Sequence, residues 1–299
     1  MIQEYRYRLE YALLASFMGL LSLMAMEQAS QLSGWLARKI GPRLGINRVA
    51  LKNLKMALPG RTDKEYADIL ERMWNNLGRM IAEYTDLEYF VPDIELVGVE
   101  NLKRALETHR QAIIFSGHIG NWEIMAPTLL SYGIPVDLIY RAPNNPWVDK
   151  LLNRFRSLEG KLRTMPKSIS GTRQLVESVK NGRSIGILID QKYNEGLPMP
   201  FFGHPAMTSP AFVQLAQKFD CPLVPFRVER IEKTQFRLSF YPPLQLYAEN
   251  DAARPVKEVI AEAHALLESW ITERPDQWLW MHRRWIGNRK KPRPPSQAQ

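Results

Sequence analysis

Cysteine is nearly absent from this 299-residue sequence, and its scarcity excludes two kinds of site. Because Cys221 stands alone, the chain can form no internal disulfide and no cysteine-rich metal centre. The sequence also lacks the Gly-x-Ser-x-Gly elbow of serine hydrolases and the glycine-rich loops that bind nucleotide phosphates. The composition that remains, 45% hydrophobic and 24% charged, is that of a globular protein.

Acidic residues are missing from a long segment near the N-terminus. Tyr11–Met26 contains no charge, and Gln28–Thr62 carries only basic charges, at Arg38, Lys39, Arg43, Arg48, Lys52, Lys55 and Arg61. A helix over Tyr11–Met26 would cover roughly 24 Å, short of the ~30 Å hydrocarbon core of a bilayer. An apolar helix beside a basic run predicts an uncleaved anchor, spanning or interfacial, at the cytoplasmic face of an anionic membrane. A buried core helix and a cleaved signal peptide remain alternatives.

Beyond this segment, short apolar runs alternate with helical patterns. Strands are expected at Ile94–Val99, Ala112–Phe115, Val136–Tyr140, Leu162–Met165, Ile185–Ile189, Leu223–Val228 and Phe236–Phe240. Helices are expected at Leu102–Thr108, Trp122–Tyr132, Trp147–Leu158, Gly171–Lys180, Pro210–Phe219 and Val256–Glu273, with an earlier one from Asp63, as its cap, toward Tyr89. This order predicts an α/β fold: a single domain with a mainly parallel, roughly seven-stranded sheet flanked by helices.

The expected organisation has three parts. An N-terminal membrane-anchor helix occupies residues 1–40, the α/β domain residues 41–287, and a basic, proline-rich, disordered tail residues 288–299. In such sheets, functional sites form at the carboxyl ends of the strands.

The most informative segment is His118-Ile-Gly-Asn-Trp-Glu123, directly after the predicted strand Ala112–Phe115. Asn121 is a plausible N-cap for the next helix, and Gly117 and Gly120 permit a tight turn before it. In that turn Glu123 could accept a hydrogen bond from one imidazole nitrogen of His118, leaving the other nitrogen free to take a proton from a hydroxyl. The alternative interpretation is that His118 and Glu123 only cap the start of a helix and have no catalytic role.

Several ordered segments together resemble a known family. His118-Ile-Gly-Asn-Trp-Glu123 resembles the H-x4-D/E motif of glycerolipid-type acyltransferases. Its Gly-Asn-Trp-Glu sequence is similar to that of the branch that makes the late acylations of lipid A. Further segments resemble later blocks of that branch: Tyr140–Pro146, Asp190-Gln191, Phe201–Pro205, Thr208, Leu223–Pro225 and Gln277–Trp285. The likeness extends from the N-terminal segment to about Trp285.

The resemblance implies transfer of a fatty acyl chain from a thioester to a lipid hydroxyl. Acyl carrier protein or coenzyme A would be the donor, with no metal and no bound cofactor, and a lipid A precursor would be the acceptor. His118 would act as general base, oriented by Glu123. Arg141 or backbone amides of Gly117–Asn121 would stabilise the oxyanion.

The remaining site residues are less sharply defined. Asn121, Arg141, Asn145, Asp190 and Gln191 are expected to bind substrate, because each follows a predicted strand or helps to form a motif. Arg141 could equally bind a lipid A phosphate, position Glu123 or form a structural ion pair. Asp190 could simply cap a turn. For Asn145 and Arg173, substrate contact and loop structure remain equally open.

The partners follow from charge and from the resemblance. A net charge of +9 favours an anionic partner, and the basic residues beside the apolar segment indicate a membrane surface. We expect no nucleic-acid binding, because no recognition motif accompanies the charge. The expected location is the cytoplasmic face of the bacterial inner membrane. An alternative function keeps the fold and acylates a glycolipid mannoside, a lysophospholipid or an ornithine lipid.

Overall fold

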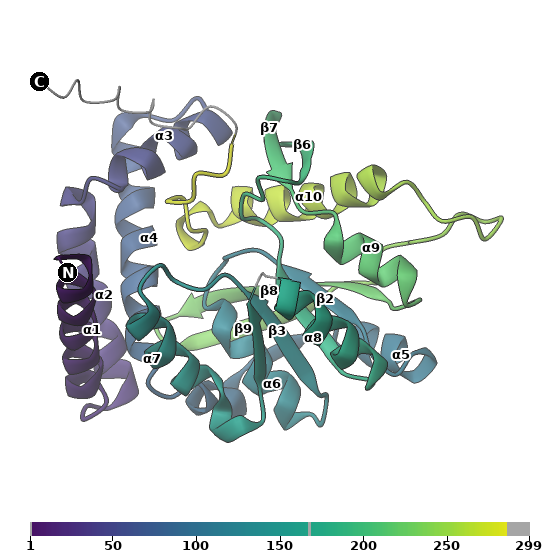
Figure 1. The fold of residues 1–299 in the computed structure, drawn as a ribbon. Coiled ribbons are helices and arrows are strands. Elements are labelled where there is room, and N and C mark those ends of the chain that lie inside the picture. The colour runs from purple at the N-terminus through teal and green to yellow at the C-terminus, as the bar shows by residue number, and fades with distance from the viewer. Residues whose placement is uncertain (1, 167–168, 286–299) are drawn as a thin grey trace, which may run out of the picture.

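The computed structural model describes residues 2–166 and 169–285, which include a seven-stranded sheet of order β1-β9-β8-β2-β5-β3-β4 (Figure 1). The strands are β1 (Glu95–Val97), β2 (Ile113–Ser116), β3 (Val136–Tyr140), β4 (Arg163–Pro166), β5 (Ser184–Leu188), β8 (Leu223–Glu232) and β9 (Gln235–Phe240). Strands β8, β2, β5, β3 and β4 are parallel, whereas β9 is antiparallel to β8 and parallel to β1. The predicted mainly parallel sheet is therefore confirmed.

The central strand β2 is buried on both faces because helices cover both faces of the sheet. Ile113 and Phe115 of β2 belong to one hydrophobic cluster with α8, α9 and α10, and Ile114 belongs to a second cluster with α5 and α6. The bounds are α5 (Val99–Thr108), α6 (Met125–Ser131), α8 (Ile169–Lys180), α9 (Ala211–Lys218) and α10 (Val256–Glu273). Alternation along each strand thus divides the core into two layers.

Two local features differ from the sequence prediction. The helix expected over Trp122–Tyr132 is a short 3₁₀ turn, η3 (Trp122–Ile124), followed by α6. A hairpin of β6 (Leu197–Phe201) and β7 (His204–Thr208), absent from the prediction, packs on α10. Prolines within β6 and β7 explain the omission, since proline weakens a strand pattern.

The helices before the sheet form a separate layer (Figure 1). They are α1 (Ile2–Leu21), α2 (Met26–Ile40), η1 (Gly41–Arg43), α3 (Asn47–Ala57) and α4 (Asp63–Glu83), followed by η2 (Glu88–Asp93). Thr62, not the expected Asp63, caps α4 through a reciprocal pair of hydrogen bonds with Glu65. Helix α2 packs along α4, and α1 packs on α7 (Pro146–Arg156).

The N-terminal segment corrects one prediction. Instead of one anchor helix, residues 2–40 form α1 and α2 with a turn between them. Within residues 2–166 and 169–285, none of the helices has both the length and the apolar character needed to cross a bilayer. Many apolar side chains of this layer are nonetheless exposed, among them Leu9, Leu13, Leu20, Leu23 and Trp35. The predicted tail, 288–299, lies outside the described residues.

Candidate active site

The pairing of β2 with β5 explains how the site forms. Ser116 pairs with Leu188 in the parallel register, and the amide of Ile189 donates to the carbonyl of Ser116 over 2.9 Å. Two residues further along each strand stand His118 and Asp190. Adjacent parallel strands end at the same edge, so residues 72 positions apart in sequence meet there.

His118 and Asp190 form a hydrogen-bonded pair. Nδ1 of His118 lies 2.7 Å from Oδ1 of Asp190, and the backbone amide of His118 donates to Oδ2 over 2.8 Å. An ionised carboxylate can only accept, so Nδ1 carries the proton and Nε2 is the basic nitrogen. Only 9% of His118 is exposed, and Asp190 is fully buried. The pair is a fixed imidazole–carboxylate dyad.

The environment keeps Asp190 ionised. Burial alone would raise the pKa of Asp190, but the charge and the hydrogen bonds of His118 outweigh burial and hold the pKa well below its usual range. The indole N–H of Trp278 donates to Oδ2 over 2.7 Å. The carboxylate therefore stabilises a positive imidazolium when one forms.

The second imidazole nitrogen of His118, Nε2, lies beside Gln191. The amide nitrogen of Gln191 lies 3.1 Å from Nε2 of His118, so it donates to the basic nitrogen. The rings of Trp122 and His282 pack against the imidazole edge to face, with ring centres 4.7 and 4.8 Å away. Burial and the nearby His118 lower the pKa of His282 to about 3, so this second imidazole is neutral.

Glu123 has different partners. Arg156 binds its two carboxylate oxygens, over 2.7 Å from Nε and 2.6 Å from Nη2. Tyr84 donates its hydroxyl to Glu123, and Trp122 donates its indole N–H over 2.9 Å. Burial would raise the pKa of Glu123, but the Arg156 guanidinium outweighs it and the pKa lies below its usual value. The prediction that Glu123 orients His118 is therefore wrong for this geometry: Asp190 takes that place.

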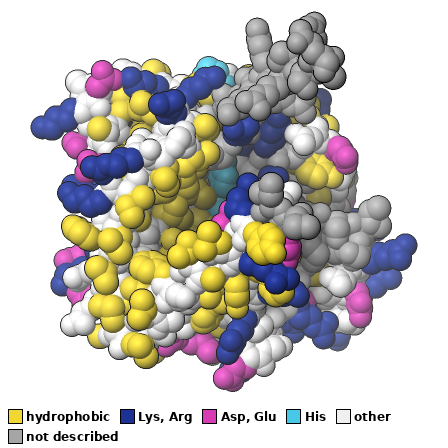
Figure 2. All heavy atoms as spheres, turned by 60° about the vertical axis from the view of Figure 1, so that its left-hand side comes forward, with side chains coloured by type: hydrophobic (Ala, Val, Ile, Leu, Met, Phe, Trp, Pro, Cys, Tyr) yellow, Lys and Arg dark blue, Asp and Glu magenta, His cyan; other side chains and the backbone are white. Residues whose placement is uncertain are grey.

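His118 and Glu123 still share one cleft. Its lining combines polar groups with apolar side chains: His118, Trp122, Glu123, Met125, Leu138, Ile139, Tyr140, Arg141, Arg156, Gly186, Ile187, Leu188 and Gln191. The cleft holds about 120 Å³, less than the roughly 300–1,000 Å³ of pockets that enclose drug-sized ligands. Figure 2, seen from the side of α1 and α2, shows a hollow with histidine inside and hydrophobic side chains beside it.

The other predicted residues divide into two groups. Arg141 and Gln191 line the cleft, and Arg141 has no hydrogen-bond or ion-pair partner among residues 2–166 and 169–285. Asn121 is fully buried, caps η3 by accepting from the amide of Glu123, and does not line the cleft. Asn145 caps α7 and donates to α1 at Tyr7 and Glu10, which is a structural role, and its contact with substrate stays a prediction. Arg173, on α8, is exposed and is not among the cleft-lining residues.

Of the backbone amides expected to form an oxyanion hole, three already donate to acceptors within the protein. The amide of His118 donates to Asp190, that of Ile119 to Gly117, and that of Gly120 to Gln277. A buried donor without a partner exists instead on Arg156: within residues 2–166 and 169–285, nothing accepts a hydrogen bond from its Nη1. Burial alone would lower the pKa of Arg156, but Glu123 and Tyr84 outweigh it and raise the pKa above its usual value. Arg156 is among the residues that line the same cleft as His118.

Sequence reasoning missed Arg156 and Tyr84 because neither belongs to a recognised segment. Arg156 ends α7, and Tyr84 follows α4, 39 residues before Glu123. Trp278 was part of the closing motif, but its link to Asp190 was not foreseen. Among residues 2–166 and 169–285, no group of three or more histidine, cysteine, aspartate or glutamate side chains is arranged to hold a metal ion.

The chain is similar to known proteins over most of its length. The model of the family described as bacterial lipid A biosynthesis acyltransferase matches residues 3–286. The chain is 26% identical over 248 residues to the lipid A biosynthesis palmitoleoyltransferase of Escherichia coli, covering 79% of this chain and 77% of that protein. It is 23% identical over 249 residues to the lauroyltransferase of the same organism, covering 79% and 78%. A Shigella flexneri lipid A biosynthesis acyltransferase is 26% identical, again over 79% of this chain and 77% of that protein. The chain belongs to the bacterial lipid A biosynthesis acyltransferase family and is an acyl-transferring enzyme.

Proposed function

We propose that the protein transfers a fatty acyl chain from an acyl thioester, carried by acyl carrier protein or coenzyme A, to a hydroxyl of a lipid A precursor. The observation that carries this proposal is the dyad at the cleft. His118 is held by Asp190 at Nδ1 and presents Nε2 toward a cleft lined with apolar side chains. Family membership supplies the acyl-transfer chemistry.

The proposed reaction begins with proton removal. The acceptor hydroxyl replaces the Gln191 amide at Nε2 of His118 and gives its proton to that nitrogen as its oxygen attacks the thioester carbonyl carbon. Asp190 stabilises the imidazolium that forms. The tetrahedral intermediate then expels the thiolate, the carbon–sulfur bond breaks, and the imidazolium returns the proton to sulfur. An ester and a free thiol result, and His118 is neutral again.

The negative oxygen of the intermediate needs a donor. The guanidinium of Arg156 is buried, permanently charged and without an acceptor at Nη1 among the described residues. Its position is fixed from behind by Glu123 and Tyr84. In the proposal, Arg156 stabilises the oxyanion and Glu123 positions Arg156.

The acceptor would be met at the cytoplasmic face of the inner membrane. Leu9, Leu13 and Leu20 of α1 are at least 60% exposed, and Trp35 of α2 is 53% exposed. Hydrophobic side chains gather on the face that Figure 2 shows. Basic residues follow at Arg38–Lys52. An apolar surface beside positive charge suits an interfacial position on an anionic bilayer.

Mass spectrometry tests the proposal directly. Purified protein is incubated with lauroyl or palmitoleoyl thioesters of carrier protein or coenzyme A, together with a lipid A precursor, a lysophospholipid, a glycolipid mannoside or an ornithine lipid. We expect one acyl mass to be added to the lipid A precursor, and none in a His118→Ala reaction. Acylation of another acceptor alone would replace the proposed substrate, and undiminished transfer by His118→Ala would contradict the base.

A further inference from the structure

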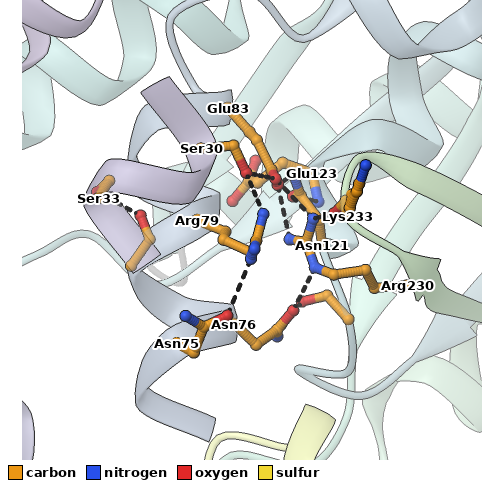
Figure 3. A network of polar contacts seen from close by, with 12 residues as sticks. Ser30, Ser33, Asn75, Asn76, Arg79, Glu83, Asn121, Glu123, Arg230 and Lys233 are labelled. Carbon is orange, nitrogen blue, oxygen red and sulfur yellow. Dashed lines mark hydrogen bonds and ion pairs between the residues drawn. The ribbon is translucent and has the colours of Figure 1, made fainter. Parts of the chain in front are cut away.

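A buried carboxylate behind the catalytic turn collects donors from three parts of the chain (Figure 3). Glu83, at the end of α4, is fully buried. Its Oε1 accepts from Ser30 over 2.8 Å and from Nη1 of Arg230 over 2.6 Å. Its Oε2 accepts from Nη2 of Arg230 and from Asn121, each over 2.8 Å. The charge is thus fully paired without any contribution from the cleft.

One arm of this network holds the turn that carries His118 and Glu123. Asn121 donates to Glu83 and accepts the amide of Glu123 over 3.2 Å. Asn76, on the same helix as Glu83, donates to the carbonyl of Gly120 over 3.1 Å. Two successive residues of the turn are therefore tied to α4.

The turn has little room to move by itself. Gly120 has a φ of +62°, and a Cβ there would stand 2.5 Å from the carbonyl oxygen of Val228 on β8. The amide of Gly120 donates to the carbonyl of Gln277 over 3.0 Å. Arg230, also on β8, reaches Asn76 over 2.8 Å. A shift of Glu83 would therefore be transmitted to the turn through several contacts.

The other arm reaches the N-terminal layer. Ser30 lies on α2 and is fully buried, and Ser33 donates to the carbonyl of Gly78 on α4 over 2.6 Å. A Cβ at Gly78 would stand 2.4 Å from Cβ of Ala37, so the two helices approach closely. Helix α2 also carries Trp35, which is 53% exposed. The helix that presents apolar surface thus contributes a donor to the buried carboxylate.

A second buried carboxylate provides a comparison. Asp137 on β3 is fully buried, accepts from Nε and Nη2 of Arg183 over 2.8 and 2.6 Å, and accepts from Ser178 over 2.6 Å. The chemistry matches that of Glu83: one arginine, one serine and no exposure. Among the described residues, none of these three side chains hydrogen-bonds to the turn of residues 117–123.

We infer that Glu83 is a positioning residue for acyl transfer: with Arg230 and Asn121 it fixes the turn of residues 117–123, and Ser30 makes α2 part of that support. The inference rests on the proposed function where activity is measured. What distinguishes the Glu83 pair from the Asp137 pair is its hydrogen bond to Asn121 in the turn. Small displacements at a catalytic centre lower rates by about 10²-fold.

The experiment pairs isosteric variants of the two carboxylates. Glu83→Gln and Asp137→Asn each remove one buried charge, and kcat and KM for transfer from a lauroyl thioester to a lipid A precursor are compared at equal folded fraction. We expect Glu83→Gln to lower kcat by about 10–100-fold with a smaller change in KM, and Asp137→Asn to leave kcat unchanged. Equal kcat in both variants would overturn the inference.

Variants of the two buried serines, Ser30 and Ser178, provide a second test in case a carboxylate variant fails to fold. Ser30→Ala and Ser178→Ala each delete one hydrogen bond to the respective carboxylate. We expect Ser30→Ala to lower kcat by about fivefold, the factor that one lost hydrogen bond corresponds to, and Ser178→Ala to leave it unchanged. If Ser30→Ala is as active as Ser178→Ala, α2 does not help to fix the turn of residues 117–123.

A structural readout separates this inference from the proposed function. Hydrogen–deuterium exchange of amides 117–123 does not depend on the substrate or on the reaction. We expect faster exchange in Glu83→Gln than in Asp137→Asn at temperatures where both are folded. Unchanged exchange contradicts the positioning role, even where acyl transfer is observed. Faster exchange without transfer by the wild-type protein supports positioning and contradicts the proposed function.

Discussion

The two halves of the cleft use their carboxylates differently. In the imidazole half, Asp190 accepts from Nδ1 of His118, whose charge comes and goes with a proton. In the guanidinium half, Glu123 binds Arg156, whose charge is permanent. A transient cation needs a partner that stabilises it when it appears, whereas a permanent cation needs one that fixes its position. In the proposed mechanism the first half transfers the proton and the second stabilises the oxyanion.

The largest expected effect lies in the imidazole half. Asp190→Asn removes the negative charge. Because Oδ2 accepts from two N–H groups, the amide nitrogen of the new side chain would face Nδ1 and favour the wrong tautomer, so we expect kcat to fall by on the order of 10²–10⁴-fold. Glu123→Gln should cost less, because Arg156 keeps its charge. Steady-state rates from mass spectrometry, with thermal unfolding as the folding control, provide the measurement. A larger loss in Glu123→Gln would reverse the assignment of the two carboxylates.

A smaller effect is expected in the guanidinium half. Arg156→Lys keeps the positive charge but loses the two-point contact with Glu123 and the free Nη1 donor. We expect kcat to fall by about 10–100-fold while KM changes little, since the contact is made mainly in the transition state. A variant that raises KM at constant kcat would make Arg156 a ground-state binding residue.

The pH dependence of the free energy of unfolding gives the smallest expected effect and again distinguishes the two halves of the cleft. The pKa of His282, beside His118, is lowered to about 3 by burial, whereas an unfolded histidine titrates near ~6.5. Between these two pH values the unfolded chain therefore binds more protons than the folded chain. The contribution of His282 to the free energy of unfolding is present above pH ~6.5 and is lost as the pH falls toward about 3. The slope is about 1 kcal/mol per pH unit.

His282→Phe should flatten this part of the curve. Urea unfolding from pH 7 to pH 4.5 measures the slope for the variant and the wild-type protein. His264, whose pKa burial lowers to about 4, contributes in the same direction and keeps some slope in the variant. Burial would raise the pKa of Glu123, but Arg156 outweighs burial and lowers it, so Glu123 adds to the slope only as the pH approaches the unfolded value of ~4.3 at the lower end of this window. An unchanged slope in His282→Phe would contradict a buried neutral imidazole.

Much of the fold could be predicted because the central strands are short, largely apolar runs. Ala112–Phe115 is apolar and buried, and β3 begins and ends where expected although it contains Asp137. The β6–β7 hairpin was missed because its prolines weaken the pattern. The N-terminal layer was only partly predicted: absence of charge indicated helix but did not show that Leu21 and Met26 bound a turn.

The site was predicted by residue but not by partner. His118, Glu123, Asp190 and Gln191 were all named from segments at strand ends, and the structure brings them together. Which carboxylate meets the imidazole depends on β5 lying beside β2 in a given register, a fact of strand order that no local pattern contains. Nearness in sequence favoured Glu123, and adjacency in the sheet favoured Asp190.

The most direct test of the account is the state of the His118 imidazole. Nitrogen-15 NMR of histidine-labelled protein reports the protonated nitrogen, and the account predicts a proton on Nδ1 with a downfield resonance from the 2.7 Å contact with Asp190. That resonance should disappear in Asp190→Asn and persist in Glu123→Gln. If the resonance instead persists in Asp190→Asn and is lost in Glu123→Gln, then Glu123 and not Asp190 orients the imidazole of His118.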